Sequence, residues 1–221
     1  MRTTTEPPES RSLVAWGWGA FALLTLVSAG LVAGVQVYVR TGYVDHLVDS
    51  LDASTIYDED VSRELLAQEE AALPRLTAAV LSPDSSPLMR ARALSVLGLT
   101  HDDRALPAIA ASVEDPDPTV RRAAVEALGT LQRPGGIDAL RKAAADPAPE
   151  VRIRSVDSTA AYYFGDVAPE PALEILCGLA RDPSPEVRGS AHHHLRNVLD
   201  TVATADDHPH RAAARAALEG R

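Results

Sequence analysis

The chain has 221 residues, of which 46% are hydrophobic, 24% charged and 4% aromatic, and its formal net charge is −10. The single cysteine, Cys177, excludes a disulfide scaffold and a four-cysteine zinc site. The apolar content argues against general disorder, and the negative charge argues against a nucleic-acid-binding protein, which needs clustered positive charge.

The N-terminal part contains a long apolar run. No charged residue occurs from Leu13 to Val39, and Gln36 is the only strongly polar side chain among these 27 residues. About 20 apolar residues in a helix cross a bilayer, and aromatic residues near both ends are typical of such helices. We therefore predict a single transmembrane helix. The corresponding division is an N-terminal tail at 1–12, the helix at 13–39, an acidic juxtamembrane linker at 40–61 and a repeat domain at 62–221.

The sequence also bears on whether this segment is cleaved and on how it is oriented in the membrane. Val27-Ser28-Ala29 resembles a signal-peptide cleavage site, but ten further uncharged residues follow it, which favours an uncleaved anchor. Arg2 and Arg11 precede the helix and only Arg40 follows closely. Because basic residues favour the cytoplasmic side, we expect a cytoplasmic tail and a repeat domain on the non-cytoplasmic side.

Gly30 and Gly34 form a G-x-x-x-G pair within the apolar run. Small residues four apart allow two membrane helices to approach closely. The pair therefore predicts self-association of this helix, and with it a possible homodimer.

The remainder of the chain repeats itself. Four stretches start at Asp84, Asp115, Asp146 and Asp182, with spacings of 31, 31 and 36 residues. In each, proline follows the aspartate by three positions, and an apolar residue and an arginine come two and three positions after the proline. Proline suits the first turn of a helix, and an oxygen-bearing side chain just before it caps the helix. The predicted caps are Ser86, Asp117 and Ser184, whereas Ala148 lacks a capping oxygen.

Each repeat is predicted to be a helical hairpin. The first helix starts at the proline, and Gly98 and Gly129 are predicted to end it in two repeats. The second helices are predicted at Asp103–Glu114, Ile137–Ala145, Pro171–Ala180 and about Pro209–Leu218. Ser62–Leu81 reads as a further helix, which Pro74 is expected to bend or split.

The pattern D-P-x-P-x-V-R-x-x-A-x-x-A-L-G resembles HEAT repeats, particularly the short type named after phycobilisome (PBS) lyases. The resemblance implies an all-α fold, a short HEAT-like α-solenoid of helical hairpins, here on a single N-terminal transmembrane helix. It also implies that the repeated arginines pair with acidic groups of neighbouring repeats. These arginines are Arg90, Arg121, Arg152 and Arg188. The third repeat departs from the pattern at Ser158-Thr159, where Ala-Leu is expected.

Motifs for catalysis are absent from the sequence. There is no phosphate-binding glycine loop, no G-x-S-x-G and no H-E-x-x-H. Cys177 falls on an apolar helical stripe, as a small buried hydrophobe would. His192, His193 and His194 are consecutive, so on a helix their side chains point about 100° apart and cannot share one metal ion. We therefore expect no enzyme activity, no cofactor and no metal.

Solenoids bind partners through extended faces, usually lined by their second helices. The candidate partner-binding residues on these helices are Arg104, Arg141, Lys142, Glu174 and Arg181. Tyr163 is a further candidate from the cluster Tyr162–Phe164, whose rings are either binding anchors or plugs in the core. The sequence predicts a membrane-anchored, non-catalytic scaffold or adaptor for an unidentified protein partner. The alternative is a bilin-lyase-like or metal-dependent enzyme or chaperone built on the same repeats.

Overall fold

The computed structural model describes residues 31, 33, 34, 36, 42–52, 59–201 and 209–220. The chain divides into two units, Met1–Tyr43 and Val44–Arg221. The described residues of the first unit are helical, and Gly34 is exposed among them. The tail 1–12, most of the predicted transmembrane segment 13–39 and Gly30 lie outside the described residues. Among the helices that are described, none has the length and apolar character needed to cross a membrane.

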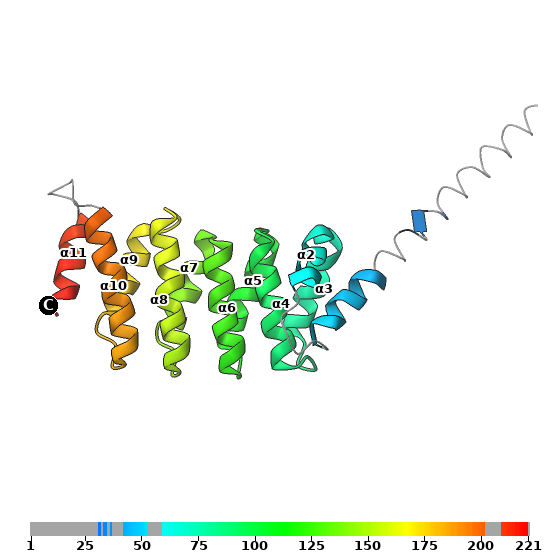
Figure 1. Ribbon diagram of the computed structural model, residues 1–221, viewed down its shortest axis with the longest axis horizontal. Coiled ribbons are helices and arrows are strands. Elements are labelled where there is room, and N and C mark those ends of the chain that lie inside the picture. The colour runs from blue at the N-terminus through cyan, green and yellow to red at the C-terminus, as the bar shows by residue number, and fades with distance from the viewer. Residues whose placement is uncertain are drawn as a thin grey trace, which may run out of the picture. The chain divides into compact units, whose positions relative to one another are not determined.

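The second unit consists of two rows of helices (Figure 1). The first row contains α4 (Pro87–Leu99), α6 (Pro118–Leu131), α8 (Pro149–Phe164) and α10 (Pro185–Thr201). The second row contains α3 (Glu69–Leu81), α5 (Leu106–Ala111), α7 (Ile137–Ala143), α9 (Pro169–Leu179) and α11 (Pro209–Leu218). A helical segment at 44–52 and α2 (Glu59–Ala67) precede them. Successive helices of the first row pack against one another, and those of the second row do so directly or, between α5 and α7, through the 3₁₀ turns that flank them. The unit is therefore an all-helical solenoid over its described residues, as predicted.

The repeated proline begins every helix of the first row. Ser86 Oγ accepts a hydrogen bond from the backbone N–H of Met89 at 3.0 Å, and Asp117 Oδ1 accepts one from Thr119 at 2.7 Å. Both predicted caps are confirmed. Ser184 Oγ instead donates to the Glu186 carboxylate at 2.6 Å. Ala148 makes no side-chain capping hydrogen bond, because its methyl group carries no acceptor.

The two glycines expected to end helices do not do so. Gly98 and Gly129 lie inside α4 and α6, which continue to Leu99 and Leu131. A Cβ at Gly98 would stand 2.9 Å from the Cα of Ala127, and one at Gly129 would stand 2.6 Å from Ser158 Oγ. These glycines therefore lie where neighbouring first-row helices approach too closely for a Cβ. The prediction was wrong because a helix-ending glycine and a packing glycine look alike in one sequence.

Two of the four predicted second helices differ clearly from the prediction, whereas α9 begins two residues early and α11 has the predicted bounds. The predicted helix Ile137–Ala145 ends at Ala143. The segment Asp103–Glu114 contains the 3₁₀ turns η1 (Asp103–Ala105) and η2 (Ser112–Glu114) on either side of α5. A third turn, η3 (Pro134–Gly136), precedes α7. Pro74 lies inside α3 and does not split the predicted helix 62–81. The break lies at Gln68, whose carbonyl accepts from Ala71 and Ala72 at the start of α3.

The core is a continuous cluster of aliphatic side chains and alanines that runs through all the repeats. Tyr162 is its one fully buried aromatic side chain in the described chain, and its hydroxyl donates to the Arg133 carbonyl at 2.9 Å. Burial raises the Tyr162 pKa to about 12, so the hydroxyl stays protonated and remains a donor. Such a core positions the exposed side chains of both rows at regular intervals.

Candidate functional site

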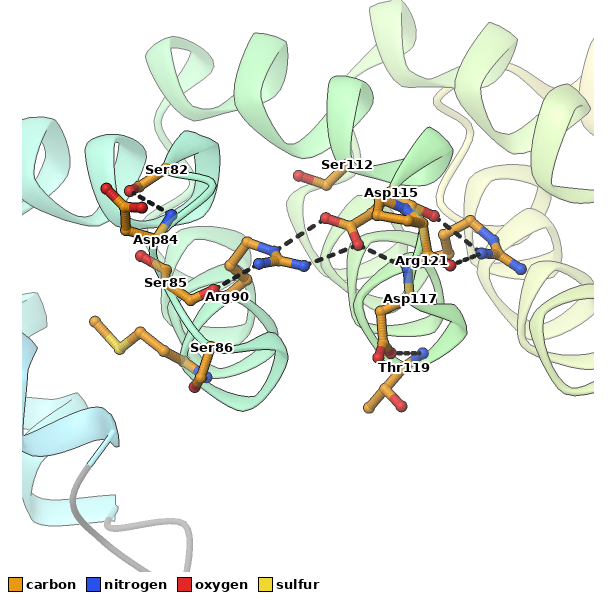
Figure 2. Close-up of polar contacts among 12 residues, drawn as sticks. Ser82, Asp84, Ser85, Ser86, Arg90, Ser112, Asp115, Asp117, Thr119 and Arg121 are labelled. Carbon is orange, nitrogen blue, oxygen red and sulfur yellow. Dashed lines mark hydrogen bonds and ion pairs between the residues drawn. The ribbon is translucent and has the colours of Figure 1, made fainter.

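The repeated arginines and aspartates form a ladder between first-row helices. Arg90 contacts both carboxylate oxygens of Asp115 through Nε and Nη2, at 3.0 and 3.1 Å (Figure 2). Arg121 and Asp146 repeat this bidentate contact at 2.7 and 3.0 Å, and Arg152 and Asp182 do so at 2.7 and 2.9 Å. These side chains are largely buried, so the ladder is structural and offers little surface to a partner. The pairing predicted from the resemblance is confirmed for these three arginines.

Each ladder aspartate also shapes the turn that precedes its own helix. Asp115 accepts from the backbone N–H of Asp117 at 2.9 Å, and Asp146 and Asp182 accept from the N–H two residues on at 2.8 Å. The hydrogen bond from Arg152 lowers the pKa of Asp182. Arg188, the fourth arginine, donates to the carbonyls of Asp182 and Pro183, and the described residues place no carboxylate of a following repeat on it.

The second row of helices carries most of the candidate partner-binding residues, and the structure pairs their charges across neighbouring repeats. Arg104 contacts Asp102 at 2.6 Å and Glu70 of α3 at 2.9 Å. Lys142 of α7 pairs with Glu114 of the preceding repeat.

Arg141 of α7 and Glu174 of α9 are the remaining two charged candidates on these helices that pair with each other. Arg141 contacts Asp138 at 2.8 Å and reaches Glu174 of α9 at 3.4 Å. We call Arg104, Arg141, Lys142 and Glu174 the second-row charges. Because they are well exposed, solvent screens their ion pairs strongly, and a partner's charges can replace them at little cost.

A groove lies at the C-terminal end of the second row, and we call it the terminal groove. It measures about 680 Å³ and lies between Glu170–Arg181, which covers α9 and the turn after it, and Pro209–Ala217 along α11. Cys177 lies in it, half-buried, with Sγ 3.7 Å from the Ala213 carbonyl oxygen. Burial raises the pKa of this thiol, so it is neutral and not an activated nucleophile. The candidate Arg181 lies at the same groove and donates to the Cys177 carbonyl at 3.3 Å.

The aromatic cluster divides between core and surface. Tyr162 and Tyr163 are buried, whereas Phe164 is 45% exposed. The Tyr163 hydroxyl lies 3.0 Å from Nδ1 of His210 on α11, and Glu170 lies 3.9 Å from Nε2 of the same ring. The two tyrosines thus fill space in the core, and Tyr163 offers little surface to a partner. Sequence analysis missed His210, because nothing near it signals a contact 47 residues away.

The three consecutive histidines contact three different neighbours. His192 Nε2 lies 3.2 Å from the Ala180 carbonyl, and the exposed His193 has its Nε2 3.4 Å from Nδ2 of Asn197. His194 lies 3.3 Å from Asp157, and this hydrogen bond lowers the pKa of the carboxyl. Within the described part of the chain, no group of three or more His, Cys, Asp or Glu side chains could hold a metal ion.

Comparison with known proteins gives the class of the repeats. Residues 73–160 match the family model of HEAT repeats, and this range spans α3 to α8. No curated protein matches the chain in sequence.

Solved structures share the architecture. Pds5 in its complex with Scc1 is similar over 80% of this chain, with 16% identity and a TM-score of 0.61; the match covers 33% of the Pds5 chain. A designed armadillo repeat protein in complex with the peptide (KR)4 is similar over 80% of this chain and 90% of its own, with 18% identity and a TM-score of 0.50. The CpcE–CpcF complex of phycocyanin lyase from Nostoc sp. PCC7120 matches 67% of this chain and 98% of its own, with 24% identity and a TM-score of 0.47. The similarity to the first two of these structures shows an armadillo- and HEAT-like fold.

Proposed function

We propose that this protein is a membrane-anchored, non-catalytic scaffold that holds a protein partner along the second row of its HEAT-like solenoid. One observation carries the binding part of the proposal. The second-row charges are exposed on successive repeats and make ion pairs that a partner can replace. An extended polypeptide with alternating charges suits such a series of exposed charges.

The solved structures supply supporting analogy. Pds5 is in complex with Scc1, and the designed armadillo protein is in complex with a peptide. Both are similar to this chain in fold, and fold alone does not determine function. The choice of a protein partner therefore rests on the exposed charges of this chain.

The membrane part of the proposal rests on the sequence of residues 13–39, which lacks charge. The repeat domain lies on the non-cytoplasmic side, and the anchor pairs with itself through Gly30 and Gly34. Protease treatment of intact cells tests the orientation. The repeat domain is digested from outside if the proposal holds, and it survives until the membrane is opened if the orientation is reversed.

A photo-crosslinking residue tests the binding face. We expect the crosslinker in place of Lys142, in the second row, to capture a protein in cells. The same crosslinker in place of Glu126, which is exposed on α6 of the first row, is the matched control. Equal capture from both positions, or capture from Glu126 alone, would contradict binding along the second row.

A further inference from the structure

The terminal groove has the dimensions needed to hold one further helix. Its two walls run in the same direction, because His210 lies near Glu170 at the start of both helices, and Cys177 lies near Ala213 one to two turns later. The helical part of the α9 wall, from Glu170 to Leu179, spans nine steps, or about 13.5 Å, and Arg181 lies just beyond its end. That length accommodates about two and a half turns of a third helix.

Small side chains let a third helix approach closely. Gly178, Ala213 and Ala216 line the groove, and a Cβ at Gly178 would have nothing within 4 Å. The lining of the groove is mainly apolar, and its charged residues are Glu170, Glu174 and Arg181. A groove of this kind receives an amphipathic helix through its apolar face.

The charges around the groove indicate which helix fits. Glu170 and Glu174 are exposed along the α9 rim, and Arg215 is exposed on α11. Glu170 and Glu174 make the first part of this rim acidic, whereas Arg181 lies at its other end. The acidic part of the rim and the basic helix α11 belong to the same protein, and they are complementary. We propose that the terminal groove holds α11 of a second copy of this chain, so that two copies form a symmetric dimer.

A two-fold axis places these charges together. In a symmetric dimer the same patch is used by both copies, and the two α11 helices run antiparallel. With the axis at the level of Cys177 and Ala213, Arg215 lies two residues beyond the axis, or about 3 Å along the helix. Glu174 lies three residues before it, or about 4.5 Å on the other side. The two-fold rotation places Arg215 of the second copy on the same side of the axis as Glu174. Measured along the helix direction, the two residues are then within about 1.5 Å of each other.

The dimer forms four helices in two layers, with α11 of each copy between α9 and α11 of the other. Ala212 and Ala216 of α11 then face the small residues of the opposing groove, where close backbone approach is possible. The contact shares Glu174 with the second-row charges of the proposed scaffold function, whereas Arg215 is not among them. It does not involve Gly30 and Gly34. It uses only the repeat domain.

The single cysteine of the chain provides a local test, because Cys177 lines the groove. The full-length chain in detergent is treated with iodoacetamide over a range of protein concentrations, and its mass is measured by light scattering. We expect the alkylation rate to fall with the fraction of unpaired chains, about tenfold when about 90% are paired. The mass should double over the same concentrations.

Charge variants identify the contact. Arg215→Glu should abolish both the protection and the mass increase, and Glu174→Arg combined with Arg215→Glu should restore them. Arg196→Glu, on an exposed position of α10, is the matched control and should leave both unchanged. Circular dichroism confirms that every variant is folded.

Three outcomes would overturn the proposal. The first is a chain that stays monomeric while the Cys177 rate is independent of concentration. The second is a dimer in which Cys177 remains fully reactive, which would place the contact elsewhere, for instance at Gly30 and Gly34. The third is protection that appears only when another protein is added, which would assign the groove to that protein.

Discussion

Substituting Gly98 by alanine tests the close contact between α4 and α6. The new Cβ would stand 2.9 Å from the Cα of Ala127 and 3.1 Å from its carbonyl oxygen. Because these are backbone atoms, they cannot turn away as a flexible side chain would. We therefore expect Gly98→Ala to destabilise the protein, although alanine is the better helix former.

The magnitude follows from two opposing effects. Overpacking of this kind costs about 1–3 kcal/mol, and replacing glycine by alanine in a helix gains up to about 1 kcal/mol. The net loss for Gly98→Ala is then about 1 kcal/mol. Gly189 is the matched control, because it lies inside α10 and a Cβ there would meet nothing within 4 Å. Gly189→Ala retains only the gain and should be stabilising.

Urea unfolding followed by circular dichroism measures both variants. Because the propensity gain is common to both, the difference between them isolates the packing cost, expected at about 1–3 kcal/mol. If Gly98→Ala stabilises the protein as much as Gly189→Ala does, α4 and α6 are not in close contact at this position. The packing role assigned to Gly98 would then be refuted.

Three further perturbations probe the ladder and the core. Asp146→Asn weakens a largely buried ion pair with Arg121 and should lower the free energy of unfolding by about 3 kcal/mol, as measured by urea unfolding. Glu114→Gln removes an exposed pair with Lys142 and should leave the urea midpoint unchanged. Similar losses for the two variants would refute the distinction between buried and exposed pairs. Thr159→Val should stabilise the fold by about 1 kcal/mol, because the Thr159 hydroxyl is fully buried and has no hydrogen-bond partner; a loss of stability would mean that the hydroxyl has a partner. The lowered pKa of Asp182 predicts a pH effect. Its stabilisation is present above the ordinary aspartate pKa of about 3.9 and is lost as the pH falls towards the lowered folded value. Thermal melts at decreasing pH should therefore show a shallower acid loss for Asp182→Asn, and an unchanged profile would contradict the assignment.

Much of the fold was predictable because the repeat signals are local. A proline in the first turn and a capping side chain such as Ser86 act within four residues, so the starts of the first-row helices were correctly placed. The ladder was predictable only through the resemblance. The partner of Arg121 lies 25 residues away, and no local rule connects it to Asp146.

The candidate site was less predictable. The charges of Arg104 and Lys142 were identified from helical periodicity, but their partners on the preceding repeat were not, because pairing depends on how the repeats stack. The sequence did not decide whether Tyr163 is a binding anchor or fills space in the core. Its burial depends on the longer third repeat and on His210 of α11, which contacts its hydroxyl.

The sequence by itself determined the repeat period, the helical class and the positions of the first-row helices, since proline geometry, capping and apolar periodicity are properties of neighbouring residues. Only the tertiary structure decided the role of Gly98 and Gly129, because close packing depends on which helix lies opposite. It also decided that Cys177 lies in a groove, because that space exists only between α9 and α11. Periodicity shows that a residue faces a neighbour, and stacking alone determines what that neighbour is.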